Sequence, residues 1–231
     1  MNLLQIVNRA RIECGVSAVA LLSFASLAAA DLRMFNWCCQ AWEDLQLANT
    51  DWEFMKIPFT FPTIASQQLY TPAQANAPTA MDWKRDTFRN YSTVAGFGDE
   101  MILPFMDQET FRNVYQFGNM RVTTGRPVAF TIDPTSRGLL IGPVPLAGYT
   151  VVGEYFRGPT TLAVAADDPS APGNDLPARW HMLLVWMAAQ SYASYEAAPE
   201  IKQRADHEAS RLFSQLETEQ STPVTWGPSL A

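Results

Sequence analysis

The chain has 231 residues, enough for one large domain or for one domain that carries an insertion. Hydrophobic residues make up 48% of it and charged residues 17%, so the composition predicts a packed core and excludes wholesale disorder. The formal net charge is -7, whereas a protein that grips nucleic acid by its phosphates needs clustered lysine and arginine. The composition therefore argues against tight nucleic-acid binding.

An apolar run at residues 16–31, VSAVALLSFASLAAAD, looks like the core of a secretion signal. Arg9 and Arg11 precede it, and no charge interrupts it before Asp31. The run is weakly hydrophobic, because it contains serines, and it is too short to span a bilayer. If it were a cleaved leader, the protein would be exported.

The residues in front of this run favour a different interpretation. Residues 2–15 have the pattern of a helix with one apolar stripe, formed by Leu3, Val7, Ala10 and Cys14. Gly15 can end that helix in the left-handed conformation. Cleavage after Ala30 would remove this helix from the mature protein. We therefore expect residues 16–31 to form a loop and the start of a second helix, in a cytosolic protein.

The cysteines and histidines do not form a recognisable site. Cys14, Cys38 and Cys39 are odd in number and include an adjacent pair, so they make a poor disulfide framework and are expected to be buried, reduced thiols. The two histidines, His181 and His207, lie far along the chain, and we expect no metal site.

A second helix is predicted from around residues 23–27 to near residue 49. Its apolar seam repeats in steps of three and four residues, at Phe35, Cys38, Trp42 and Leu45. Its tryptophans are expected to pack against other helices.

Two more helices are predicted near the end of the chain. One starts with Pro177 in its first turn and is apolar on nearly every side over residues 182–189, which predicts burial on more than one side, with another subunit as a possible neighbour. Pro199 ends or kinks it, and an amphipathic helix follows over residues 200–219. Residues 1–50 and 177–219 are predicted to pack together as a helical bundle.

Residues 51–162 are predicted to be an inserted β-rich domain, an antiparallel sandwich or barrel. Short β-rich runs recur there, and several alternate with a period of two, as in YTVVGEYFRG at residues 149–158. Residues 133–138 are predicted to be a hairpin turn between two strands. Residues 107–118 are predicted to form a short helix with Asp107 as its N-cap. The fold class is therefore α+β.

Two segments are predicted to have no regular structure. Residues 163–176 form a loop of small residues, and residues 220–231 form an extended C-terminal docking arm. The arm carries Val224, Trp226 and Leu230, and large aromatic side chains anchor interfaces. With Trp180 and Trp186 of the apolar helix, these are the predicted contacts to a partner protein or to a neighbouring subunit.

No catalytic motif is found in the chain. It has no G-x-S-x-G nucleophile elbow and no H-E-x-x-H metal motif, and Gly96-Phe-Gly98 lacks the third glycine of a dinucleotide fingerprint. His181 is expected to be a satisfied core or interface histidine. We predict no catalytic residues, no cofactor and no metal.

Four segments in this order resemble the head-to-tail adaptor, or connector, proteins of tailed bacteriophages, which are related to the tail tubular and head-completion proteins. They are LLQIVNRARIECG, RMFNWCCQAWEDLQLANTDWEFMK, GRPVAFTIDP with GLLIGPVPLAGYTVVGEYFRGP, and LPARWHMLLVWMAAQSYASYEAAPEIKQRADHEASRLFSQLE. Their order and co-occurrence carry the resemblance, which spans nearly the whole chain.

The resemblance implies a helical bundle with a β domain and a structural, non-enzymatic role in the virion neck. It implies a ring of twelve subunits that docks on the portal, contacts a tail, nozzle or tail-terminator protein, and lets double-stranded DNA pass without binding it specifically. No membrane partner is implied.

Three alternatives remain at this point. A tail terminator or another tail-tube component would share the same features. A secreted β-rich ligand- or carbohydrate-binding protein requires that the apolar run be a true signal. A virion enzyme that cuts the cell wall would be revealed by a zymogram.

Overall fold

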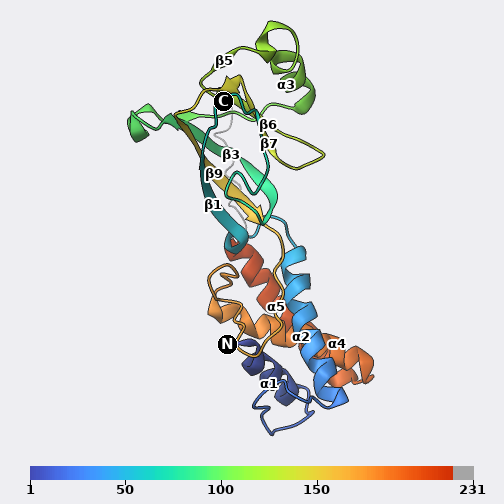
Figure 1. Ribbon diagram of the computed structural model, residues 1–231. Helices are drawn as coiled ribbons and strands as arrows, with labels where there is room; N and C mark the ends of the chain where they lie inside the picture. Colours follow the sequence, from blue (N-terminus) through green and yellow to red (C-terminus); the bar gives the residue numbers. More distant parts are fainter. Residues whose placement is uncertain (221–231) are drawn as a thin grey trace, which may run out of the picture. The chain divides into compact units, whose positions relative to one another are not determined.

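A computed structural model describes residues 1–220 of the chain. The chain divides into two compact units (Figure 1). Of the described residues, the helical unit contains 1–55 and 159–220, and the β unit contains 56–158. In the sequence, the β unit is thus inserted between the two halves of the helical unit.

The first helix, α1 (Leu3–Glu13), begins at a capping box. The Asn2 side chain accepts a hydrogen bond from the backbone N–H of Gln5, and the Gln5 side chain accepts one from the backbone of Asn2. Gly15 follows the helix with φ +67°, the left-handed conformation expected of it. The predicted apolar stripe is buried, together with Ile6.

The second helix, α2 (Ala29–Leu47), begins later than the sequence predicted. Residues 14–28 form a loop, which we call the α1–α2 loop, and Ser26 within it has a left-handed φ of +59° that is incompatible with a helix. Three residues of the predicted apolar seam are buried, namely Cys38, Trp42 and Leu45. The fourth, Phe35, is only half-buried.

The apolar helix α4 (His181–Tyr195) follows a single 3₁₀ turn, η4 (Ala178–Trp180). It packs against α1, α2 and α5 (Pro199–Gln220) of its own chain. Three neighbouring helices account for the burial of residues on nearly every side of α4.

Helix α5 reaches one residue beyond its predicted end. There the side chain of Gln220 accepts a hydrogen bond from the backbone N–H of Phe54, which lies in the short 3₁₀ turn η1 (Glu53–Met55).

Residues 159–177 contain no helix or strand, yet polar contacts fasten them to the helices. The side chain of Gln46 on α2 donates to the carbonyl of Thr160 and accepts from its N–H, both at 2.9 Å. The carbonyl of Asp167 accepts from the N–H of Leu3 at the start of α1. This stretch is therefore an ordered part of the helical unit.

The larger sheet of the β unit has four strands in the order β1-β9-β3-β4. They are β1 (Lys56–Pro62), β9 (Tyr149–Arg157), β3 (Ala80–Ser92) and β4 (Met101–Ile102), and every neighbouring pair is antiparallel. β9 is the central partner of both β1 and β3, and its pairing with β3 shifts register between Lys84 and Arg89.

The smaller sheet has the order β2-β7-β6 and is also antiparallel. Its strands are β2 (Leu69–Tyr70), β7 (Leu139–Gly142) and β6 (Ala129–Ile132). The predicted hairpin turn joins β6 to β7, and the N–H of Asp133 donates to the carbonyl of Gly138. A short pair, β5 (Thr124–Gly125) and β8 (Val144–Pro145), is parallel, which the sequence analysis did not predict.

The predicted short helix is present as α3 (Gln108–Tyr115), and the Asp107 side chain caps it by accepting from the N–H of Thr110. Two further 3₁₀ turns, η2 (Gly96–Asp99) and η3 (Gly118–Arg121), lie before and after it in the chain.

The core of the β unit is rich in aromatic side chains, and the Phe88 ring is stacked on the Phe130 ring at a centroid distance of 3.9 Å.

The structure confirms the predicted fold class. Helices from the two ends of the chain pack together, and antiparallel sheets form from the residues between them (Figure 1).

Candidate assembly surfaces

The α1–α2 loop contains most of the leader-like run, and its backbone is held by two side chains of α1. Asn8 makes a two-way contact with Leu21, because its Nδ2 donates to the Leu21 carbonyl at 3.0 Å and its Oδ1 accepts from the Leu21 N–H at 2.7 Å. Arg11 donates to the carbonyl of Val19 at 2.7 Å. These contacts fix the path of the loop over the end of α1.

The side chains at the tip of this loop point away from the protein. Leu22 is 93% exposed and Val19 is 77% exposed. Phe24, further along the loop, packs edge-to-face on Phe35 of α2 at 4.7 Å between ring centroids. The loop is thus anchored at its backbone and at Phe24, and it presents an apolar tip.

The turn η4 and helix α4 each carry one of the predicted interface residues, and the structure buries both. Trp180 is 6% exposed and Trp186 is 5% exposed. The guanidinium of Arg204 on α5 lies over the Trp186 ring, 4.8 Å from its centroid. Packing within the chain therefore accounts for both indoles, and their role at an interface stays a prediction. The other predicted contacts, Val224, Trp226 and Leu230, lie outside the described residues.

An uncharged groove lies between α4 and α5, with a volume of about 320 Å³. Its lining is Leu183, Met187, Gln190, Ala209, Ser210, Phe213 and Ser214. Sequence analysis did not identify it, because it depends on how two helices pack and not on a motif.

His181 begins α4 and has a fully buried side chain, as expected for a core histidine. Its Nδ1 accepts a hydrogen bond from the amino group of Met1 at 2.6 Å, and its Nε2 lies 3.7 Å from Oδ1 of Asp168. Burial, and then the positive amino group nearby, lower the pKa of His181. The imidazole is therefore held neutral at pH 7.

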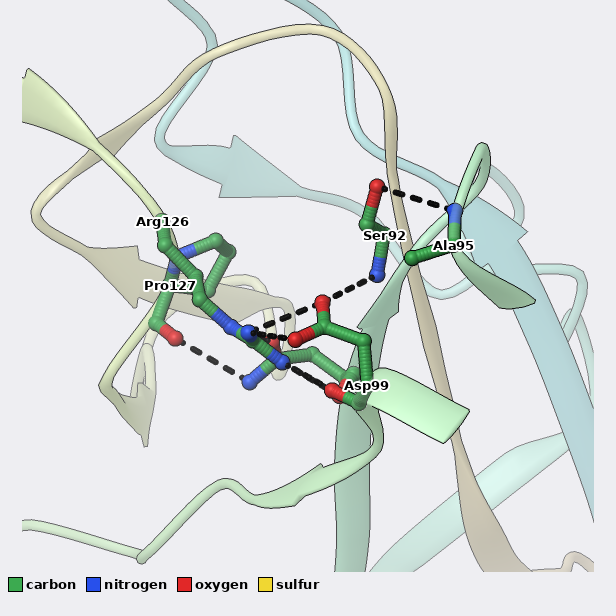
Figure 2. A network of polar contacts seen from close by, with 6 residues as sticks. Ser92, Ala95, Asp99, Arg126 and Pro127 are labelled. Carbon is green, nitrogen blue, oxygen red and sulfur yellow. Dashed lines mark hydrogen bonds and ion pairs between the residues drawn. The ribbon is translucent and has the colours of Figure 1, made fainter. Parts of the chain in front are cut away.

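In the β unit, Arg126 fastens the segment that contains η2 to strand β3 (Figure 2). Its guanidinium donates to both carboxylate oxygens of Asp99 at 2.8 and 2.9 Å, to the Asp99 carbonyl at 2.6 Å, and to the side chain and backbone carbonyl of Asn90. Asp99 also accepts from the N–H of Ser92. These bonds lower the pKa of Asp99, with the Arg126 contact as the main cause.

The segment that Arg126 fastens carries exposed apolar side chains. Val94 is 96% exposed, Phe97 is 76% exposed and Ile102 on the edge strand β4 is 66% exposed. The sequence analysis did not identify this surface. A signal was present, since two bulky apolar residues stand in a glycine-bounded turn where polar residues are usual.

Metal ligation and thiol chemistry both depend on how the candidate side chains are placed in the described residues. No group of three or more histidine, cysteine, aspartate or glutamate side chains is placed to hold a metal ion there. All three cysteines are free thiols, and burial raises the pKa of Cys14 to about 12 and that of Cys39 to about 11. Their thiolate forms, which are the reactive ones, are therefore scarce at neutral pH.

Comparison with known proteins identifies the family. A family model described as SU10 adaptor protein matches residues 1–228, nearly the full chain. The chain belongs to the SU10 adaptor protein family. Members of this family are phage structural proteins, head-tail adaptors, and the resemblance seen in the sequence is thereby confirmed. No curated protein matches the chain.

The adaptor divides its charge unevenly between its two units. The β unit has nine lysine and arginine residues and eight aspartate and glutamate residues, and is close to neutral. The helical unit has seven basic and fifteen acidic residues, so it carries the acidity of the whole chain.

Across residues 1–220 of the adaptor, no helix has both the length and the apolar character needed to cross a membrane. The leader-like run is not a helix at all over most of its length.

Proposed function

We propose that this adaptor forms a ring of twelve subunits in the virion neck, where it joins the portal to the tail and lets double-stranded DNA pass. The observation that carries the proposal is the family match over residues 1–228, in a chain with the two-unit fold that the resemblance implies. The adaptor is made in the host cytoplasm and acts by geometry, bridging two assemblies with no bond broken.

The charge distribution supports passage of DNA without capture. A ring that DNA must slide through works best when its wall does not bind phosphates, and carboxylates repel them. Because the acidity lies in the helical unit, we propose that this unit lines the DNA path. Strong binding of the isolated protein to duplex DNA at low salt would contradict this part of the proposal.

The partners proposed are the portal on one side and a tail, nozzle or tail-terminator protein on the other. Residues 221–231 are the proposed docking arm, and they carry Val224, Trp226 and Leu230. Pro223 and Pro228 restrict the unbound chain, which lowers the entropy lost when it binds. Gln220 is excluded from the arm because it belongs to α5 and bonds to Phe54.

The arm is tested with a chain truncated after Gln220. Circular dichroism and melting should stay nearly unchanged, while stable attachment to the portal should be lost. Normal attachment of the truncated chain would show that the arm is not the anchor, and unfolding would show that these residues belong to the core.

The ring is tested by mixing the adaptor with purified portal rings. We expect light scattering to report monomers of the adaptor alone, since assembly is templated, and electron microscopy to show a twelve-fold layer on the portal after mixing. A stable ring without portal would refute templating but not the adaptor role. No binding to portal, with binding to the end of a tail tube, would favour the tail-terminator alternative.

A further inference from the structure

One pocket of the β unit is lined by arginine and glutamine side chains. Its volume is about 370 Å³, and we call it the arginine pocket. Its lining consists of Gln68, Arg112, Gln116, Phe117 and Arg121, and it includes no carboxylate from residues 1–220. Four of these five side chains carry N–H donors, so the pocket offers hydrogen bonds and positive charge to an electronegative ligand.

The end of α3 brings these side chains together. Arg112 lies in the last turn of the helix and Gln116 is its C-cap, and residues four apart share one helix face. Gly118 then takes a left-handed φ of +60°, which turns the chain so that η3 lies against α3 and Arg121 lines the same pocket. The Arg112 guanidinium lies over the Phe117 ring, 5.3 Å from its centroid, and this contact orients it.

Neither arginine of this pocket is neutralised within the described part of the chain. No carboxylate of residues 1–220 forms an ion pair with Arg112 or Arg121. The Nε2 atom of Gln68 is buried, and it too has no hydrogen-bond partner among these residues. Two like charges in one pocket repel each other, and a buried donor without an acceptor costs free energy. A bound anion would relieve both costs.

A second arginine-lined pocket of the β unit has the opposite arrangement. There Arg85 lies over the Phe105 ring, 4.4 Å from its centroid, and Arg137 also lines the pocket. Asp82 and Asp133 line the same pocket, so it contains its own counter-charges. An arginine held on an aromatic ring is therefore not by itself an anion site in this protein. The missing counter-charge sets the arginine pocket apart.

The surface around the arginine pocket is apolar. Val114, Phe117, Met120 and Val122 are all exposed there, Val122 by 78%. Protein interfaces are enriched in arginine, methionine and aromatic side chains, whereas DNA is gripped by clusters of lysine and arginine. Two cations within an apolar surface therefore fit an acidic group of a protein better than a nucleic acid.

We propose that the arginine pocket binds a carboxylate that a protein partner in the virion presents between apolar side chains. Arg112 and Arg121 supply the positive charge, since a guanidinium donates two parallel hydrogen bonds to a carboxylate, and Gln68 and Gln116 supply further donors. The apolar surroundings exclude water, which strengthens the ion pair. This inference rests on the proposed adaptor function, to which it adds a docking site in the β unit.

Nuclear magnetic resonance tests the pocket without its partner. The probe is sodium glutarate, a small dicarboxylate, which is titrated into the full-length adaptor at constant ionic strength while the arginine Nε–H signals are recorded. The signals of Arg112 and Arg121 should shift and saturate. Arg85 is the matched control, because it lies on an aromatic ring in a pocket with two aspartates, and its signal should stay in place. Equal shifts at all three arginines, or none at any, would overturn the proposal.

Charge removal tests the protein partner. The double variant Arg112→Gln with Arg121→Gln should keep the wild-type melting temperature, because both side chains are exposed and unpaired, and should lose at least tenfold in affinity for portal rings or for the tail-side protein. Arg85→Gln with Arg89→Gln is the matched control, since it removes the same charge from exposed positions of the β unit outside the arginine pocket. The control should bind both partners normally.

The outcomes separate this site from the adaptor function. If the Arg112 and Arg121 variant binds portal and tail-side protein as well as the wild type does, the site is wrong and the adaptor function stands. If a short DNA duplex binds the wild type and loses its affinity in this variant, the pocket belongs to nucleic acid and the proposal is overturned. If the wild-type adaptor binds neither protein, the proposed function fails, and the protein partner of this pocket fails with it, whatever the glutarate titration shows.

Discussion

Nε of Arg11 lies 2.7 Å from Oδ1 of Asp31, and the two side chains are only 7% and 15% exposed. This buried ion pair joins the last turn of α1 to the first turn of α2, and Asp31 also lies where a helix N-terminus favours a negative charge. Through a second nitrogen, Arg11 holds the carbonyl of Val19. The residues that mimic a secretion signal are therefore fastened at both ends and built into the helical unit.

Replacing one partner of this pair should be costly. Arg11→Met should lower the free energy of unfolding by about 3 kcal/mol, because it leaves the Asp31 carboxylate without its cation and frees the loop from α1. The measurement is chemical denaturation of the monomer. Lys202→Met is the matched control, since Lys202 makes an exposed ion pair with Asp206 four residues on, and should cost less than about 0.5 kcal/mol. Equal effects of the two variants would show that the Arg11 pair is not structural.

Trp186 tests whether α4 is buried by its own chain. Trp186→Ala should destabilise the monomer by about 3 kcal/mol or more, because it leaves a cavity where the indole was packed beneath Arg204. Thermal melting of the unassembled protein is the measurement, with Trp186→Phe as a milder control. An unchanged melting temperature with failed assembly would instead place Trp186 at a subunit interface, as the sequence alone suggested.

Gly142 at the end of β7 is predicted to tolerate no side chain. A Cβ there would lie 2.7 Å from the ring of Tyr115 and 3.0 Å from that of Phe111, both on α3. Gly142→Ala should therefore destabilise the β unit by about 1–3 kcal/mol through overpacking. Gly98→Ala is the control, since a Cβ at Gly98 meets nothing within 4 Å and its φ is not positive. Similar melting temperatures for the two variants would mean that α3 is free to move away from β7.

His181 should make stability depend on pH below neutrality. Because burial lowers its pKa in the folded state, the unfolded chain binds a proton at His181 that the folded chain refuses. The contribution is fully present above the unfolded pKa of about 6.5 and is lost as the pH falls from there toward the folded pKa. The free energy of unfolding, measured from pH 7.5 to 5, should fall less steeply in His181→Gln than in the wild type. His207→Gln, at an exposed position of α5, should keep the wild-type slope; equal slopes in all three proteins would refute the prediction.

The helices and several strands were predictable because their signals are local. The apolar period of α1, the cap at Asp107 and the turn between β6 and β7 each depend on residues within one or two turns of chain. The start of α2 was predicted too early for a related reason. Residues 23–28 have good helical patterning, but Ser26 adopts a left-handed φ of +59° and Phe24 packs on Phe35 of α2, and neither feature can be read from the local pattern.

Periodicity, turn residues and segment order follow the chain, so they were enough to predict the α+β class, the helices at the two ends with strands between them, and the family. Which apolar residues stay exposed depends instead on contacts between distant parts of the chain. Leu21 and Leu22 are neighbours of equal hydrophobicity, yet Leu21 is half-buried and Leu22 is 93% exposed. The backbone of Leu21 is held by two hydrogen bonds to the side chain of Asn8, 13 residues away, and no local pattern encodes such a contact.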